Sequence, residues 1–89
     1  MDCILAIDSG LTVTKAVLFD LKGKQLGVVH KNVRQLMPHP RHVERDMDDL
    51  WTQTASAIRE VIAAVGIDAG EILAVAATAH GDGIYLLDE

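Results

Sequence analysis

Apolar positions in the first third of the chain occur in short runs that end in acids or turn residues. Residues 3–7 form a continuous apolar run, residues 13–19 form a second run richer in β-branched side chains, and residues 25–33 form a third. Residues 20–24 between the second and third runs are typical of a turn. Because short links permit antiparallel pairing in order, this pattern predicts a three-stranded meander.

The middle of the chain changes to helical spacing. Asp46 is a good N-cap, Asp48 and Asp49 suit the positive end of a first helical turn, and Gly66 provides a stop. Trp51 is expected in the core, on the apolar face of this helix. The predicted face consists of Leu50, Trp51, Thr54, Ala55, Ile58, Val61, Ile62 and Val65.

The flanking segments complete an α/β pattern. Residues 36–42 are expected to form a loop, because two closely spaced prolines exclude both a helix and a central strand. Residues 72–77 are an unbroken apolar strand, expected to be central and covered on both faces. Residues 84–87 begin another strand. The predicted order is β-β-β-α-β-β, and one helix cannot cover such a sheet, so residues 1–89 are expected to be part of a larger domain.

Composition narrows the class of protein. The chain has 89 residues, 49% of them hydrophobic, and a net charge of −5, which argues against a nucleic-acid binder. Cys3 is the single cysteine; it is expected to be buried and inert, in a reducing, cytoplasmic setting. The apolar runs are too short for a membrane span, and a signal peptide is not expected.

The turn after the first strand carries the first candidate chemistry. Asp8 ends an apolar run, and Gly10, Thr12, Thr14 and Lys15 follow it closely. Backbone amides and hydroxyls suit phosphate oxygens, and a carboxylate suits a Mg²⁺ ion or its waters. A glycine here allows a positive φ and close approach of a ligand. Taken alone, the pattern is as compatible with an ordinary hairpin turn as with a Mg-phosphate site.

A second polar group follows the strand at 72–77. His80, Gly81 and Asp82 lie in the segment 78–83, which contains two glycines. Ligands in α/β sheets gather beyond the carboxyl ends of strands. If the strands that precede Asp8 and Asp82 are parallel neighbours, both carboxylates face one cleft. His80 taken alone is more typical of a structural, hydrogen-bonded histidine.

Other reactive side chains point to no additional chemistry. His39 and His42 suggest zinc, but the loop supplies no further ligand in a defined spacing, so a polar surface loop is favoured. Ser9 and Ser56 have no histidine beside them in sequence, which leaves covalent catalysis without support.

Four motifs in order resemble the N-terminal part of the FGGY carbohydrate kinases. These enzymes belong to the actin/hexokinase/Hsp70 superfamily and have a ribonuclease H-like fold. The resemblance covers essentially the whole chain. It is carried by residues 4–10 with Lys15, Ala16 and Asp20, residues 42–46 with Leu50 and Trp51, residues 74–83, and residues 86–88.

The resemblance implies an ATP-dependent kinase that requires Mg²⁺ and acts on a small sugar or polyol. It places Asp8 at the Mg-nucleotide, directly or through water. It assigns the first phosphate-binding hairpin to Gly10, Thr12, Thr14 and Lys15, and the substrate hydroxyls to His80, Gly81 and Asp82. The catalytic aspartate and the adenosine site of the family lie beyond residue 89, so the chain alone is expected to be inactive. The full-length enzyme could be a homo-oligomer.

Departures from the family patterns bear on the substrate. Glycerol kinases would carry arginine where Gly81 stands, and D-xylulose kinases would carry Gln-Met-His at positions 80–82. The spacing of Gly81 and Gly83, with residues 44–47, is similar to the L-xylulose kinase branch. That branch would have Gln and Lys at positions 80 and 82. A ketopentose or related polyol is therefore expected. The alternative is a non-catalytic actin-like module that binds a ligand or partner through the same cleft.

Overall fold

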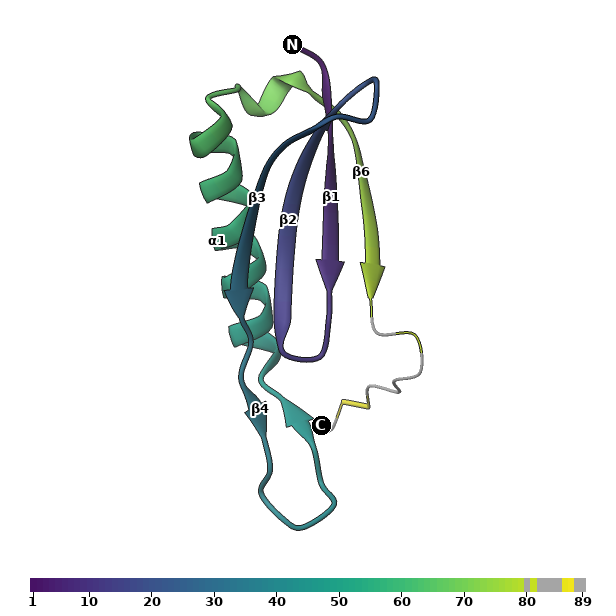
Figure 1. The fold of residues 1–89 in the computed structure, drawn as a ribbon. Coiled ribbons are helices and arrows are strands. Elements are labelled where there is room, and N and C mark those ends of the chain that lie inside the picture. Colours follow the sequence, from purple (N-terminus) through teal and green to yellow (C-terminus); the bar gives the residue numbers. More distant parts are fainter. Residues whose placement is uncertain (80, 82–85, 88–89) are drawn as a thin grey trace.

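A computed structural model describes residues 1–79, 81 and 86–87. Its main sheet has four strands in the order β3-β2-β1-β6, with one long helix on one face (Figure 1). The elements are β1 (Cys3–Ser9), β2 (Val13–Asp20), β3 (Gln25–Asn32), β4 (Gln35–Leu36), β5 (Glu44–Arg45), α1 (Met47–Val65), the 3₁₀ helix η1 (Ala69–Glu71) and β6 (Ile72–Ala79).

The strand pairing confirms the predicted meander and adds a parallel neighbour. β1 pairs with β2, and β2 with β3, in antiparallel fashion, while β1 pairs with β6 in parallel. The β2–β3 turn is stabilised by Asp20, whose Oδ1 accepts hydrogen bonds from the N–H groups of Lys22 and Lys24, each at 2.9 Å. Gly23 supplies the positive φ of 86° that this turn needs. Asp20 is therefore a turn residue, at the opposite end of β2 from Lys15.

Helix α1 begins and ends as its sequence signals predict. The Asp46 side chain accepts a hydrogen bond from the Asp49 N–H at 3.1 Å, which caps the first turn. Gly66 has a left-handed conformation with φ 81°, and its N–H donates to the Ile62 carbonyl. The helix packs on β2 and β3, and Val61 is fully buried at this interface.

The core lies between α1 and one face of the sheet. Alternate residues of each strand point toward the helix, so Cys3 and Leu5 on β1 share this side with Ala16 and Leu18 on β2. Cys3 is buried as expected, and its Sγ contacts the Glu71 carbonyl at 3.6 Å. The core is aliphatic, and it fills only the part of the sheet that α1 covers.

Gly27 of β3 permits this close packing. A Cβ at position 27 would lie 2.6 Å from Cγ2 of Val65, closer than real Cβ contacts come. We expect Gly27→Ala to lower the free energy of unfolding by about 1–3 kcal/mol, because a β-branched valine cannot rotate aside cheaply. Urea denaturation measures the change in the free energy of unfolding. Gly70→Ala is the matched control, since a Cβ there meets nothing within 4 Å, and equal stability losses in the two variants would contradict the packing argument.

An ion pair joins β3 to α1. The Glu60 carboxylate accepts from Lys31 Nζ and from Ser56 Oγ, and these contacts lower the pKa of Glu60 below its usual value of 4.5. Because the folded state has the lower pKa, this stabilisation is present above pH 4.5 and is lost as the pH falls through the folded-state pKa.

Glu60→Gln should therefore lower Tm slightly at pH 7. The gap between variant and wild type should close as the pH is lowered to about 3 and shrink in high salt, because the pair is exposed. Thermal denaturation across pH gives both readings. A gap that is constant with pH would show that the charge of Glu60 is not responsible.

Two expectations about the fold are wrong, and a third is confirmed. Trp51 is 70% exposed, because α1 packs mainly on β2 and β3 and no described residue covers this flank of the helix. Strand β6 is an edge strand of the described sheet rather than a central one, and Leu73 and Val75 are about 60% exposed. The loop predicted at residues 36–42 is confirmed: only Leu36 belongs to a strand, and residues 37–42 lie in the connection from β4 to β5 in a short hairpin.

Two further findings complete the comparison with the sequence. The last predicted strand, residues 84–87, lies mostly outside the described residues, and its described part, 86–87, has no assigned secondary structure. Within the described part of the chain, no helix has the length and apolar character that crossing a membrane requires.

Candidate functional site

The candidate site lies at the edge of the sheet where β1 and β6 both end. The parallel register places Asp8 opposite Thr78 and Ser9 opposite Ala79. In the antiparallel direction Asp8 faces Lys15, which in turn faces His30 of β3. Residues at matched register positions share a face, so one polar row crosses the four strands. By alternation from the buried Leu5, this row is on the face opposite α1.

The turn between β1 and β2 lies directly beside this row. The Gly10 N–H donates to the Val13 carbonyl at 2.9 Å and closes the turn. Gly10 does not have the positive φ that was expected. A Cβ at this position would lie 3.1 Å from the Val13 carbonyl oxygen, a tight contact that the turn would have to relax by a few tenths of an ångström. Leu11 and Thr12 at the tip are exposed and accessible to a ligand.

Thr14 faces away from the turn. Its side chain is fully buried between sheet and helix, and its Oγ1 lies 3.3 Å from Thr54 Oγ1. Its burial follows from strand alternation, because Thr14 shares the core-facing side with Ala16 and Leu18. In this arrangement the Thr14 hydroxyl cannot reach a phosphate at the turn, which corrects its expected role as a side-chain ligand.

Two long-range hydrogen bonds hold the turn from outside. Arg45 Nη2 donates to the Gly10 carbonyl at 3.0 Å, and the Val33 N–H donates to the Thr12 carbonyl at 2.7 Å. Neither residue was a candidate from the sequence, because both are far from the turn along the chain.

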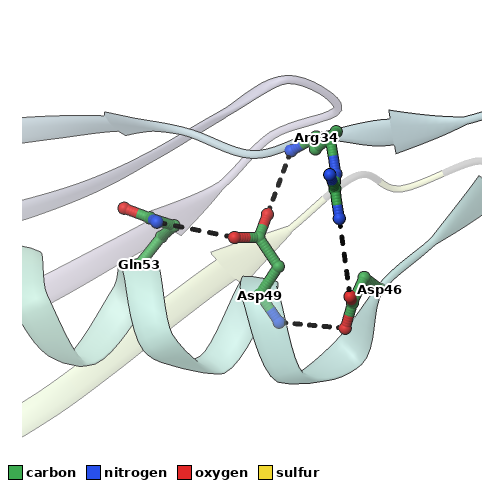
Figure 2. Close-up of polar contacts among 4 residues, drawn as sticks. All are labelled: Arg34, Asp46, Asp49 and Gln53. Atoms are coloured by element: carbon green, nitrogen blue, oxygen red, sulfur yellow. Dashed lines mark hydrogen bonds and ion pairs between the residues drawn. The ribbon is translucent and has the colours of Figure 1, made fainter.

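The residues next to these two donors contact each other at the start of α1 (Figure 2). Arg34 Nη2 lies 3.8 Å from Asp46 Oδ2, and the Arg34 N–H donates to Asp49 Oδ2 at 3.2 Å. Gln53 Nε2 contacts the other oxygen of Asp49 at 3.5 Å. Asp46 and Asp49 therefore have structural roles at the helix N-terminus, and Asp46 already caps it.

Of the three residues predicted to bind substrate, only Gly81 lies in the described part of the chain. Gly81 lies in a turn after β6, exposed and with open space where a Cβ would be. His80 and Asp82 lie outside the described residues. The parallel pairing of β1 and β6 is nevertheless the arrangement on which the shared cleft depended.

Asp8 is the candidate metal donor at this edge of the sheet. No group of three or more His, Cys, Asp or Glu side chains that could hold a metal gathers within the described ranges. Asp8 is exposed, so its carboxylate is accessible. This fits Mg²⁺, which binds one or two carboxylates, keeps several waters and takes its other ligands from substrate phosphates.

His39 and His42 lie in the tip of the β4–β5 hairpin. Their rings pack edge to face with centroids 5.3 Å apart, and the His42 N–H donates to the His39 carbonyl at 3.0 Å. Both side chains are exposed. Their contacts are those of a turn in a surface hairpin.

Known proteins are similar to this chain across its full length. The chain is 38% identical over 89 residues to a probable L-xylulose kinase of Pasteurella multocida, which covers 100% of this chain and 18% of that protein. It is 38% identical over 85 residues to a glycerol kinase of Marinomonas sp., covering 96% of this chain and 17% of the relative. The chain thus spans less than a fifth of the length of these relatives.

Solved structures of sugar kinases resemble the fold. The structure of a ligand-bound xylulose kinase from Lactobacillus acidophilus matches 89% of this chain and 16% of its own, with a TM-score of 0.71 and 28% identity. The mixed sheet and single helix match the N-terminal part of the actin-like ATPase fold of sugar kinases, as the ribonuclease H-like prediction expected. The model of the FGGY family of carbohydrate kinases, N-terminal domain, matches residues 3–89. The chain therefore belongs to the FGGY family of carbohydrate kinases, matching the N-terminal domain of that family.

Proposed function

We propose that the chain is the first part of an ATP-dependent kinase that transfers the γ-phosphate of ATP to a hydroxyl of a ketopentose or polyol. One observation carries the proposal: Asp8 ends β1 beside a tight, exposed turn, with the parallel end of β6 next to it. That arrangement brings a carboxylate, backbone amides and the carboxyl end of β6 to one edge of the sheet.

The nucleotide side of the site involves four residues. Asp8 would hold Mg²⁺ directly or through water, and the exposed turn at Gly10 and Thr12 would contact phosphate oxygens. Lys15, opposite Asp8 in the register, adds a positive charge. When bound with the nucleotide, the ion neutralises phosphate charge. Thr14 contributes to the packing beneath the turn, where its hydroxyl is buried.

The substrate side follows β6. Gly81 gives a ligand access to the backbone, and His80 and Asp82 are proposed to hydrogen-bond the substrate hydroxyls. Gly81 stands where glycerol kinases would carry arginine, which favours a ketopentose over glycerol. A relative named as a probable L-xylulose kinase supports the same substrate class. Phosphoryl transfer also requires a base and an adenosine site, which we propose lie in further residues of a longer protein.

A coupled ADP-release assay on the full-length protein tests the proposal. We expect Mg²⁺-dependent ADP release with at least one pentulose or polyol in a panel that includes L-xylulose, D-xylulose and glycerol. The 89-residue chain alone should release none. MgATP binding without turnover on any member of a broad panel would favour a non-catalytic ligand-binding module instead.

A further inference from the structure

The β1–β2 turn has two external supports, and both act on its backbone carbonyls. Arg45 Nη2 binds the Gly10 oxygen and the Val33 N–H binds the Thr12 oxygen. In a planar trans peptide the C=O of one residue and the N–H of the next point in opposite directions. Holding the Gly10 carbonyl therefore also sets the direction of the Leu11 N–H, on the side of the turn away from Arg45.

The two segments that carry these donors are also joined to each other by an ion pair. Val33 is followed by Arg34, and Arg45 is followed by Asp46, and the side chains of Arg34 and Asp46 pair at 3.8 Å (Figure 2). Arg45 is further placed by β-pairing with Gln35. The backbone carrying Arg45 is thus fixed both by the β4–β5 hairpin and by the capped start of α1.

The bond from Arg45 is also the one charged contact on the turn among the hydrogen bonds of the described residues. Arg45 is half-buried, and its bond to Gly10 is partly shielded from water. Hydrogen bonds that involve a charged group are worth more than neutral ones, and shielding strengthens them. We expect loss of this bond to free the Gly10–Leu11 peptide to rotate, since the hairpin and the helix cap are held by other contacts.

We propose that Arg45 is a positioning residue for nucleotide binding, which holds the β1–β2 turn in the form that receives the phosphates. This inference rests on the proposed function, because the turn is assigned to the nucleotide there. It adds a residue from a different element, 35 positions away in sequence. Its role is exerted through the Gly10 carbonyl rather than through contact with the nucleotide.

The test compares Arg45→Met, Arg45→Lys and Arg41→Met in the full-length protein. Arg41 is exposed in the same hairpin, and its removal changes net charge equally without touching the turn. We expect Arg45→Met to raise KM for MgATP about 10- to 100-fold, which corresponds to the loss of one charged hydrogen bond. kcat and KM for the sugar should stay within about twofold, because binding is lost equally in the ground and transition states. Arg45→Lys should recover part of the loss, and Arg41→Met should resemble wild type.

Calorimetric titration with MgADP separates this inference from the proposed function, because it needs no turnover. Weaker MgADP binding by Arg45→Met supports the inference even if no sugar is phosphorylated. Equal binding by Arg45→Met and wild type overturns it, even if the kinase is active. A lower Tm for Arg45→Met with unchanged nucleotide affinity would show a purely structural contact and would also overturn it. Absence of MgADP binding by wild type would overturn both.

Discussion

Asp8→Asn is expected to abolish sugar phosphorylation by the full-length kinase while leaving the protein folded. Asp8 is exposed at the end of β1, and the hydrogen bonds of the described fold do not use its carboxylate. Asparagine keeps the shape and removes the charge. If that charge organises Mg²⁺ at the phosphates, several kcal/mol of transition-state stabilisation disappear, which is about a thousandfold or more in kcat/KM.

Asp2→Asn is the matched control for this experiment. Asp2 is exposed just before β1, at the other end of the same strand, so the chemical change is identical but remote from the turn. Steady-state kinetics at saturating MgATP and thermal denaturation should be measured on both variants. Asp8→Asn with most of the wild-type kcat would rule out the metal-organising role, and a large loss of Tm would indicate a structural one.

Leu18→Ala should have the largest effect on stability. Leu18 is fully buried in the centre of the core, between β2 and α1. Leucine-to-alanine changes at such sites cost about 2–5 kcal/mol, because the lost contacts leave a cavity that closes only partly. Since small domains have a free energy of unfolding of only about 5–15 kcal/mol, this loss is a large fraction of the total.

Urea denaturation with a constant m-value would measure the change directly. Leu21→Ala provides the control, because Leu21 is 58% exposed in the turn after β2 and removes the same atoms from a solvated position. We expect the control to change the free energy of unfolding by less than about 0.5 kcal/mol. Similar losses at positions 18 and 21 would contradict the placement of the core.

Elements with local signals were predicted correctly from the sequence. The helix boundaries follow from the Asp46 cap and the left-handed Gly66, and each acts within a few residues. The meander follows from short apolar runs with tight turns between them. The burial of Thr14 could also have been predicted, because Thr14 alternates along β2 with Ala16 and Leu18. Its position next to the turn instead led to the prediction that its hydroxyl binds phosphate.

Features that depend on distant segments could not be predicted in this way. Trp51 has the spacing of a buried helix face, yet which flank of a helix is covered depends on its neighbours. An apolar run such as β6 is compatible with a central strand, and only the sheet order shows it at the edge of the described residues. The contact of Arg45 with Gly10 joins residues that no local pattern relates.

The parallel pairing of β1 with β6 has a consequence for the order of folding. The β1–β2 hairpin contains only local contacts and can form in about 1–10 μs. Asp8 and Thr78, in contrast, are adjacent only after the meander, the helix and η1 have brought nearly opposite ends of the sequence together. Such distant closures are slow. During synthesis, we therefore expect the β1–β6 edge of the candidate site to form after the β1–β2 hairpin, once β6 has left the ribosome.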